Sequence, residues 1–334
     1  MTEPSGPAPS DGPALDADGQ PRLTTFGLSG RAVPGLYLVG WIASFMGAST
    51  ILVSLLSTGS TAARWVFLAG LIVLGLGLFA AAGSQSVERG RRPSLAFRGP
   101  SPVLAFAAVV ALSLLAILIV VAPLSVLGLD PASPLGTTVS LAATTLVFVL
   151  VVRLLVVGPG ALTWTEMGLP RPSRAAAMEL TLGAVFALPV LVVTLVLAAI
   201  VARVLAPPES VLPPAGDLTG LLANLLSAAV LAPIGEEVFF RGFATTAWAR
   251  SAGTRSAILR GAVFFAFAHI VTVFSTSFSS GAPTALAQFL DLLPVGLALG
   301  WLFLARRSLY AAIGLHAAFN AIQVVLLFAA VRPG

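Results

Sequence analysis

Cysteine and lysine are both absent from this 334-residue sequence, and each absence limits its chemistry. Without cysteine, the chain has no disulfide framework, no thiolate nucleophile and no thiolate metal ligand. Without lysine, the net charge of +5 comes entirely from arginine. Charged residues of any kind are scarce, at 9% of the chain, whereas soluble domains carry about 25%. An ordinary soluble domain is therefore excluded.

The shortage of charge accompanies an excess of apolar residues, since 57% of the chain is hydrophobic and the mean hydropathy is +1.01. Nine apolar runs come close to the roughly 20 residues that a membrane-spanning helix needs. They cover residues 36–57, 65–83, 102–127, 137–157, 176–201, 218–240, 258–275, 284–304 and 310–331. The sequence therefore predicts an all-α, polytopic transmembrane helix bundle of about nine spans, with the lipid bilayer as its solvent.

Three regions of the chain differ in character. Residues 1–33 are rich in Pro, Gly, Asp and Ser, which predicts a disordered cytosolic tail. Residues 34–205 hold five predicted spans with few polar side chains, and their role is not assigned. Residues 218–331 follow a Pro-rich linker and contain nearly all the unusual polar residues, which predicts that the functional core lies there.

The arginines predict the orientation of the chain in the membrane. Segments rich in arginine follow the second, fourth, sixth and eighth apolar runs, and the segments between them contain few. Because arginine-rich loops stay on the cytoplasmic side, this alternation predicts a cytosolic N-terminus. The arginines form no basic stripe with interleaved aromatic residues, so nucleic acid is not an expected partner. They fit contact with an anionic membrane surface instead.

An acidic pair, Glu236 and Glu237, lies inside the sixth apolar run. A charged side chain at membrane depth costs roughly 2.5–3.5 kcal/mol on insertion scales, so two together require a reason. Glu237 and Arg241 are four residues apart and share one helix face, which predicts a supporting ion pair. Glu236 points about 100° away and remains as a candidate catalytic carboxylate. The alternative is a helix end at which both glutamates reach water.

Both histidines of the chain, His269 and His316, fall inside predicted spans. Asn320 lies four residues after His316 and shares its helix face, and Phe265 can pack beside His269 in the same way. The predicted topology places Glu236 near the cytoplasmic end of its span, His269 near mid-membrane and His316 about two turns in. A lone buried histidine is more often a satisfied core group, but this combination predicts a shared buried cluster.

These residue types suit hydrolysis by an activated water molecule. Glu236 and His269 can hold and deprotonate water, and His316 with the Asn320 amide can stabilise an oxyanion. No serine stands in a recognisable triad pattern, which disfavours a covalent acyl-enzyme. The carboxylate of Glu236 with the imidazoles of His269 and His316 could equally hold zinc. The His-Glu-x-x-His zinc motif is absent, however, and the sequence leaves both mechanisms open.

Three short motifs follow one another in the last third of the chain. They are Glu236-Glu237-x-x-x-Arg241, Phe265-x-x-x-His269 and His316-x-x-x-Asn320. In this order, and on three separate spans, they resemble the motifs of the CPBP intramembrane proteases. That family includes the type II CAAX prenyl endopeptidases and the Abi, or bacteriocin-processing, proteins. The resemblance covers about residues 218–326.

The resemblance implies a membrane-embedded endopeptidase. Glu236 and His269 would activate the water, and His316 and Asn320 would stabilise the oxyanion or complete a metal site. The remaining motif residues, Glu237, Arg241 and Phe265, would support the site. The family is often labelled as metalloproteases, although a metal-free glutamate mechanism has also been proposed for it.

The resemblance also sets expectations about partners and location. It implies a peptide or protein substrate, which is membrane-associated or lipid-modified in some members, and bacterial members are linked to bacteriocin maturation or immunity. The expected location is the plasma membrane of a prokaryote. Two alternatives stay open: a non-catalytic immunity or scaffold protein that keeps the fold, and a proton-coupled transporter, since intramembrane Glu and His also form proton relays.

Overall fold

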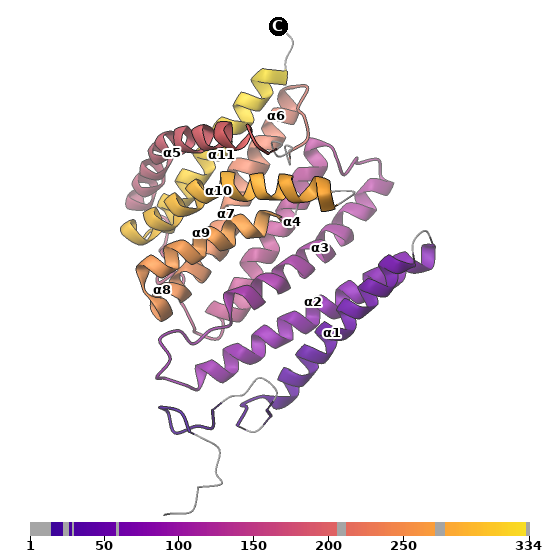
Figure 1. The fold of residues 1–334 in the computed structure, drawn as a ribbon, viewed down its shortest axis with the longest axis vertical. Coiled ribbons are helices and arrows are strands. Elements are labelled where there is room, and N and C mark those ends of the chain that lie inside the picture. Colours follow the sequence, from indigo (N-terminus) through magenta and orange to yellow (C-terminus); the bar gives the residue numbers. More distant parts are fainter. Residues whose placement is uncertain are drawn as a thin grey trace, which may run out of the picture.

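The structure is a computed structural model that describes residues 15–22, 27–28, 30–57, 60–205, 212–270 and 278–331. Helices make up nearly all of these ranges, and the only extended pairing within them is an isolated bridge between Leu15 and Pro21. Figure 1 shows the helices as one bundle, with the N-terminal helices along one side and the C-terminal helices along the other. The prediction of an all-α bundle is confirmed.

The described helices form nine continuous segments. The first five are α1 (Pro34–Leu56), α2 (Thr61–Gly90), α3 (Pro102–Val126), α4 (Pro134–Val152) with the π-helical turn η1 (Arg153–Val157), and α5 (Arg174–Val201). The sixth is one long helix made of α6 (Leu218–Leu225), η2 (Leu226–Leu231), α7 (Ala232–Glu237), η3 (Val238–Thr245) and α8 (Thr246–Ala252). The last three are α9 (Thr254–Ile270), α10 (Phe278–Arg306) and α11 (Leu309–Val331).

Eight of these segments are long and apolar enough to cross a membrane. The ninth, α9, has 17 residues, and the predicted span at residues 258–275 ends outside the described ranges. Each of the nine predicted apolar runs begins in its own helical segment, so the chain is an integral membrane protein of the predicted class. Hydropathy locates such helices because the bilayer core contains no water to bond backbone N–H and C=O groups, so an apolar spanning segment must pair them within a helix.

The sixth span ends later than the sequence predicts. The apolar run stops at Phe240, yet the helix continues to Ala252, so Glu236 lies near the middle of a 35-residue helix and not near its end. The helix continues because Arg241 is fully buried and neutralised by Glu237, and so does not mark a water boundary. Gly253, with a backbone φ of +81°, ends the helix, because that conformation suits glycine.

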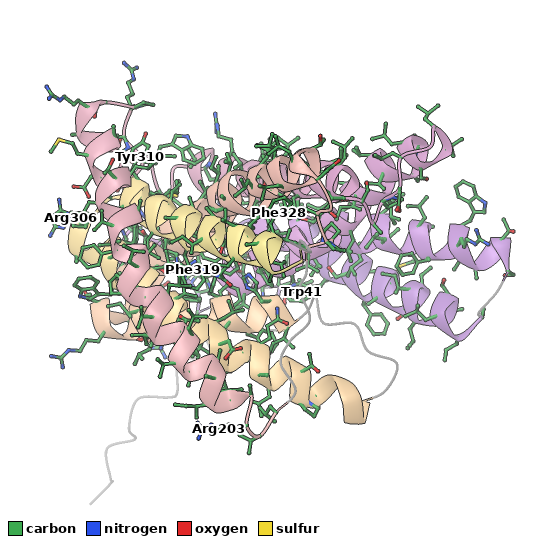
Figure 2. All side chains as sticks on the ribbon, turned by 90° about the horizontal axis from the view of Figure 1, so that it is seen from above. Trp41, Arg203, Arg306, Tyr310, Phe319 and Phe328 are labelled. Carbon is green, nitrogen blue, oxygen red and sulfur yellow. The ribbon has the colours of Figure 1, made fainter. Side chains whose placement is uncertain are left out.

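The N-terminal helices pack through glycine. In α1, Gly40 and Gly47 lie so close to α2 that a Cβ atom would approach backbone atoms of Ala81 and Leu74 at 2.5 and 2.3 Å. Gly77 of α2 approaches Ser44 in the same way. Small residues permit this close contact, which drives helix association where there is no hydrophobic gain over lipid. The opposite face of α1 carries exposed side chains such as Trp41, labelled in Figure 2.

Part of the predicted tail contacts the end of α2 and the segment that follows it. Arg92, after α2, forms an ion pair with Asp16, and Ser94 donates a hydrogen bond to Asp18. Arg31 pairs with the buried Glu88 at 3.0 Å. Most of the remaining residues of the predicted disordered tail lie outside the described ranges, so its disorder stays a prediction.

Helix α5 packs closely against α11. A Cβ on Gly183 would lie 2.0 Å from the carbonyl oxygen of Ala311, and a Cβ on Gly314 would lie 2.0 Å from that of Leu180. Both distances are far below van der Waals contact, so only glycine fits at either position. Because Gly314 lies two residues before His316, this crossing sets where α11 presents that histidine.

We expect Gly314→Ala to separate α5 from α11 and to displace His316. The overpacking should cost about 1–3 kcal/mol and should lower the unfolding temperature in detergent. The matched control is Gly35→Ala in α1, where a Cβ meets nothing within 4 Å. An unchanged unfolding temperature in Gly314→Ala would show that the crossing is looser than described.

The segment 163–170, between α4 and α5, forms an ion pair with α8 and hydrogen bonds with the start of α11. Thr163 and Glu166 form a capping box, in which the backbone N–H of each residue donates to the other's side chain. Glu166 also pairs with Arg250 of α8 at 2.7 Å. The Leu309 N–H donates to the Gly168 carbonyl, and the Tyr310 hydroxyl donates to the Pro170 carbonyl.

The hydrogen bond from Arg250, together with those from Thr163, lowers the pKa of Glu166 to about 2. A lowered folded-state pKa means that the Glu166 carboxylate stabilises the fold at pH values above about 4.5, and this stability is lost as the pH falls towards 2. The Glu166 side chain is 44% exposed, so the gain should stay below about 1 kcal/mol. We expect Glu166→Gln to unfold at a slightly lower temperature than the wild type at pH 7, and at the same temperature near pH 2. A difference that grows on acidification would contradict this.

Candidate active site

The helix that carries the acidic pair is irregular on both sides of it. The π-helical turns η2 and η3 flank α7, which ends at Glu237. In η3 the hydroxyl of Thr245 donates to the Phe240 carbonyl, five residues back, as the wider turn allows. Such π-helical turns are frequent at functional sites. They rotate the side chains that follow relative to a regular helix, which spacing rules based on 3.6 residues per turn do not anticipate.

Glu237 is completely buried and bridges two helices. Its Oε1 accepts from the Arg241 guanidinium at 2.9 Å and from Nδ1 of His316 at 2.8 Å. The pair with Arg241 is the one that the four-residue spacing predicts. The bond to His316 was missed by the sequence reasoning, because 79 residues separate the two and no local pattern connects them.

Phe265 lies at the centre of the cluster. The Arg241 guanidinium carbon lies 4.1 Å from the centre of the Phe265 ring, close enough for a cation–π contact. The same ring lies 4.5 Å from the His269 ring and 5.7 Å from the His316 ring, measured between ring centres. Phe265 therefore packs against both histidines, whereas the sequence predicted packing only against His269.

Both histidines direct their Nε2 atoms at Glu236. His269 Nε2 lies 3.7 Å and His316 Nε2 3.9 Å from Glu236 Oε2. The other ring nitrogen is occupied in each case, since His269 Nδ1 lies 2.8 Å from the Phe265 carbonyl oxygen and His316 Nδ1 is bonded to Glu237. A carbonyl oxygen only accepts, so Nδ1 of neutral His269 carries the proton and Nε2 presents its lone pair.

Glu236 Oε2 is buried and has no hydrogen-bond partner among the described residues. The rest of the side chain is not sealed, since the Glu236 side chain is 20% exposed and that of His269 26%. A buried carboxylate oxygen without a partner is costly, and a bound water molecule usually satisfies such a group. Separations of 3.7 and 3.9 Å are too long for direct hydrogen bonds and fit groups that share one small polar molecule.

Asn320 is placed differently from the other candidates. It follows His316 on α11 by one turn, as predicted, but its Nδ2 donates to the Ala228 carbonyl in η2 at 2.8 Å. The contact joins α11 to the helix that carries Glu236. One N–H of the amide is therefore already used by the backbone of that helix.

Residues 218–322 match the family model described as Type II CAAX prenyl endopeptidase Rce1-like. This part of the chain is an Rce1-like domain. The match includes every candidate residue from Glu236 to Asn320, and it assigns the domain to a family of membrane endopeptidases. Neither the curated proteins nor the solved structures contain a match to the chain.

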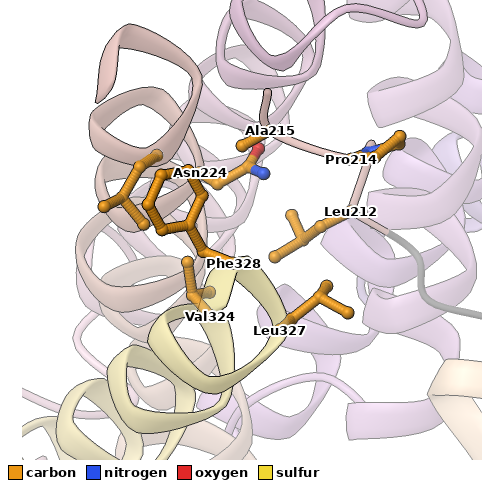
Figure 3. Close-up of a pocket in the computed structure, with 8 residues that line it drawn as sticks. Leu212, Pro214, Ala215, Asn224, Val324, Leu327 and Phe328 are labelled. Atoms are coloured by element: carbon orange, nitrogen blue, oxygen red, sulfur yellow. The ribbon is translucent and has the colours of Figure 1, made fainter. Parts of the chain in front are cut away.

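The Rce1-like domain ends within α11 and leaves out α1 to α5. The α5 helix nevertheless packs on α11 through Gly183 and Gly314. A pocket of about 180 Å³ lies around Asn224 and Phe328, between α6 and α11 (Figure 3). Asn224 precedes Glu236 by twelve residues, roughly 18 Å along a helix. This pocket is therefore separate from the candidate site.

The predicted zinc ligands are present but do not form a metal centre as they stand. The described residues contain no group of three or more His, Asp or Glu side chains placed to hold a metal ion. The donor types are suitable, and each histidine has its second ring nitrogen bonded to an oxygen atom, as metal-binding histidines usually do. Because zinc needs its ligands at about 2.0–2.2 Å, Glu236, His269 and His316 would have to move inward to bind it.

Proposed function

We propose that the Rce1-like domain is an intramembrane endopeptidase that hydrolyses a peptide bond with a water molecule held by Glu236, His269 and His316. The observation that supports this best is that Oε2 of Glu236 has no hydrogen-bond partner in the described part of the chain and faces the Nε2 atoms of both histidines. Nδ1 of each ring is bonded to an oxygen atom, which fixes the ring so that Nε2 faces the Glu236 carboxylate. A general base needs this kind of access to the proton it removes.

The proposed reaction proceeds in two steps. Glu236 takes a proton from water, with the His269 lone pair orienting that water, and the water oxygen bonds to the carbonyl carbon of the substrate. When His316 is doubly protonated, Nδ1 donates to Glu237 and Nε2 donates to the developing oxyanion, helped by the remaining N–H of Asn320. The carbon–nitrogen bond then breaks, and Glu236 returns its proton to the amine that leaves.

The buried ion pair has a defined role in this scheme. Arg241 neutralises Glu237, and Glu237 in turn fixes the orientation of the His316 ring. Phe265 packs between the guanidinium and both imidazoles. Pre-oriented donors stabilise a transition state without reorganising during the reaction, which is usually the largest catalytic contribution.

The test of the proposed function is a comparison of peptide termini in membrane fractions from cells that express the wild type or Glu236→Gln. We expect a set of cleaved products that is present only with the wild type, and lipid-modified proteins are included in the search. Identical termini in both samples would favour the non-catalytic scaffold, and proton flux into vesicles that depends on Glu236 would favour the transporter. Cleavage measured in the presence of a chelator, together with the amount of zinc bound to the purified protein, tests whether the mechanism depends on a metal.

The orientation of the chain is also a proposal, based on the alternation of arginine. Because the chain has no cysteine, single introduced cysteines report sidedness directly. We expect a membrane-impermeant maleimide to label Gly216→Cys, before α6, in intact cells. We expect it to label Ala252→Cys, beside the arginine-rich turn, only after the cells are permeabilised. The reverse pattern would invert the proposed topology.

A further inference from the structure

Pro233 lies inside the helix that carries the acidic pair, three residues before Glu236. Proline has no backbone N–H, so one carbonyl group of the preceding turn loses its usual donor. In a π-helical turn each N–H donates to the carbonyl five residues back, and at the end of η2 the Ala232 N–H donates in this way to Ser227. The next bond in this register would join residue 233 to the Ala228 carbonyl, and Pro233 cannot form it.

The Ala228 carbonyl is the group that accepts a hydrogen bond from Asn320. The Asn320 Nδ2 atom lies 2.8 Å from this oxygen, although the two residues are 92 apart in the chain. A carbonyl group without a donor is costly inside a membrane span, because the bilayer core contains no water to replace the donor. The side chain of Asn320 therefore supplies the hydrogen bond that Pro233 cannot, and it does so from another helix.

Two hydrogen bonds thus join α11 to the helix of the acidic pair, one on each side of Glu236 in the chain. The first is the bond from Asn320 to Ala228, and the second is the bond from His316 Nδ1 to Glu237 at 2.8 Å. The positions of Ala228 and Glu237 are roughly 13 Å apart along a helix. Two separate contacts fix both the depth and the rotation of the stretch that carries Glu236.

The π-helical turn η2 decides which way Glu236 faces. One extra residue in a turn rotates every later side chain by about 100° relative to a regular helix. Loss of η2 would therefore direct the Glu236 carboxylate away from both histidines, whose Nε2 atoms lie 3.7 and 3.9 Å from its Oε2. The stability of η2 is in this way linked to the direction of the proposed general base.

We propose that Pro233 and Asn320 act together as positioning residues for Glu236. Pro233 favours the wider turn, because in a regular helix its ring would clash with the carbonyl group four residues back. Asn320 stabilises that turn by donating to the carbonyl group that the proline leaves without a donor. The inference rests on the proposed function, in which Glu236 is the general base, and it gives Asn320 a task in addition to contact with the oxyanion.

A double-mutant cycle between positions 233 and 320 of the full chain tests this pairing. Pro233→Ala restores an N–H that can donate to the Ala228 carbonyl, so it should compensate for Asn320→Ala. We expect Asn320→Ala to lower the unfolding temperature in detergent, and to lower it by less than half as much in the Pro233→Ala background. Equal losses in both backgrounds would overturn the proposal. If Asn320→Ala alone does not fold, recovery of folded protein by Pro233→Ala is the expected result, and no recovery contradicts it.

Thr145→Val is the matched control for the cycle. The Thr145 hydroxyl donates to the Leu231 carbonyl at the end of η2, at 2.9 Å. Neither Gly235 nor Glu236, four and five residues after Leu231, is a proline, so this carbonyl has not lost its donor. Thr145→Val should therefore lower the unfolding temperature equally with and without Pro233→Ala. Compensation here as well would mean that Pro233→Ala strengthens the whole helix, and it would overturn the specific pairing.

Cleavage kinetics distinguish positioning from stability alone. With a substrate identified from the membrane-fraction comparison, Asn320→Ala should lower kcat by about 10²–10³-fold, as loss of an oxyanion donor does, with little change in KM. Pro233→Ala should restore part of this kcat, because it restores the direction of Glu236 but not the amide. No recovery of kcat in folded protein would refute the positioning role. The unfolding measurement needs no substrate, so it tests the pairing even if the domain cleaves no peptide.

Discussion

Glu236→Gln is expected to lower the rate of peptide cleavage by about 10²–10⁴-fold, the usual contribution of a general base. The amide keeps the size of the side chain but cannot accept the proton of the attacking water. The affected atom is Oε2, which has no other hydrogen-bond partner among the described residues and faces both imidazoles. The measurement is cleavage of a substrate identified from the membrane-fraction comparison, with purified variants in detergent.

The control for this experiment is Glu166→Gln, which removes a carboxylate outside the site that pairs with Arg250 at the protein surface. It should cleave at nearly the wild-type rate. Glu236→Gln should also remain folded, because the substitution removes a buried charge whose Oε2 forms no hydrogen bond within the described ranges. Wild-type cleavage by folded Glu236→Gln would refute the proposed mechanism.

Glu237→Gln should differ from Glu236→Gln by a large loss of stability in addition to a loss of activity. Glu237 is fully buried and binds both Arg241 and His316. Its neutral replacement leaves the buried Arg241 guanidinium without a counter-charge, and breaking a buried pair in this way costs about 3–5 kcal/mol. Thermal unfolding in detergent measures the effect. Activity should fall as well, because the His316 ring loses the carboxylate that orients it.

A double-mutant cycle measures how much Glu237 and Arg241 stabilise each other, apart from their contacts with other residues. Arg241→Met alone leaves the Glu237 carboxylate buried and uncompensated, so it too should destabilise the protein strongly. The double variant should be less unstable than the sum of the two single variants, because the second change removes the charge that the first leaves unpaired. Additive losses would mean that the two side chains do not stabilise each other. Adjacent Glu236→Gln, which should leave the unfolding temperature nearly unchanged, is the matched comparison.

Local features of the sequence determined the class of fold and the identity of the candidate residues. Spanning helices are recognisable because each must be apolar along about 20 residues to satisfy the bilayer. The pair between Glu237 and Arg241 follows from spacing alone, since residues four apart on a helix are neighbours. Glu236, His269 and His316 stand out because ionisable residues are costly in an apolar span, whatever their partners are.

Only the tertiary structure decided which of these residues meet. The bond between Glu237 and His316 and the bond between Asn320 and the Ala228 carbonyl join segments that are 79 and 92 residues apart. At the close crossing of Gly183 and Gly314, helix α5, which lies outside the Rce1-like domain, sets the position of His316 on α11. Hydropathy and helical spacing describe one segment at a time, whereas these contacts depend on how neighbouring helices pack and rotate against each other.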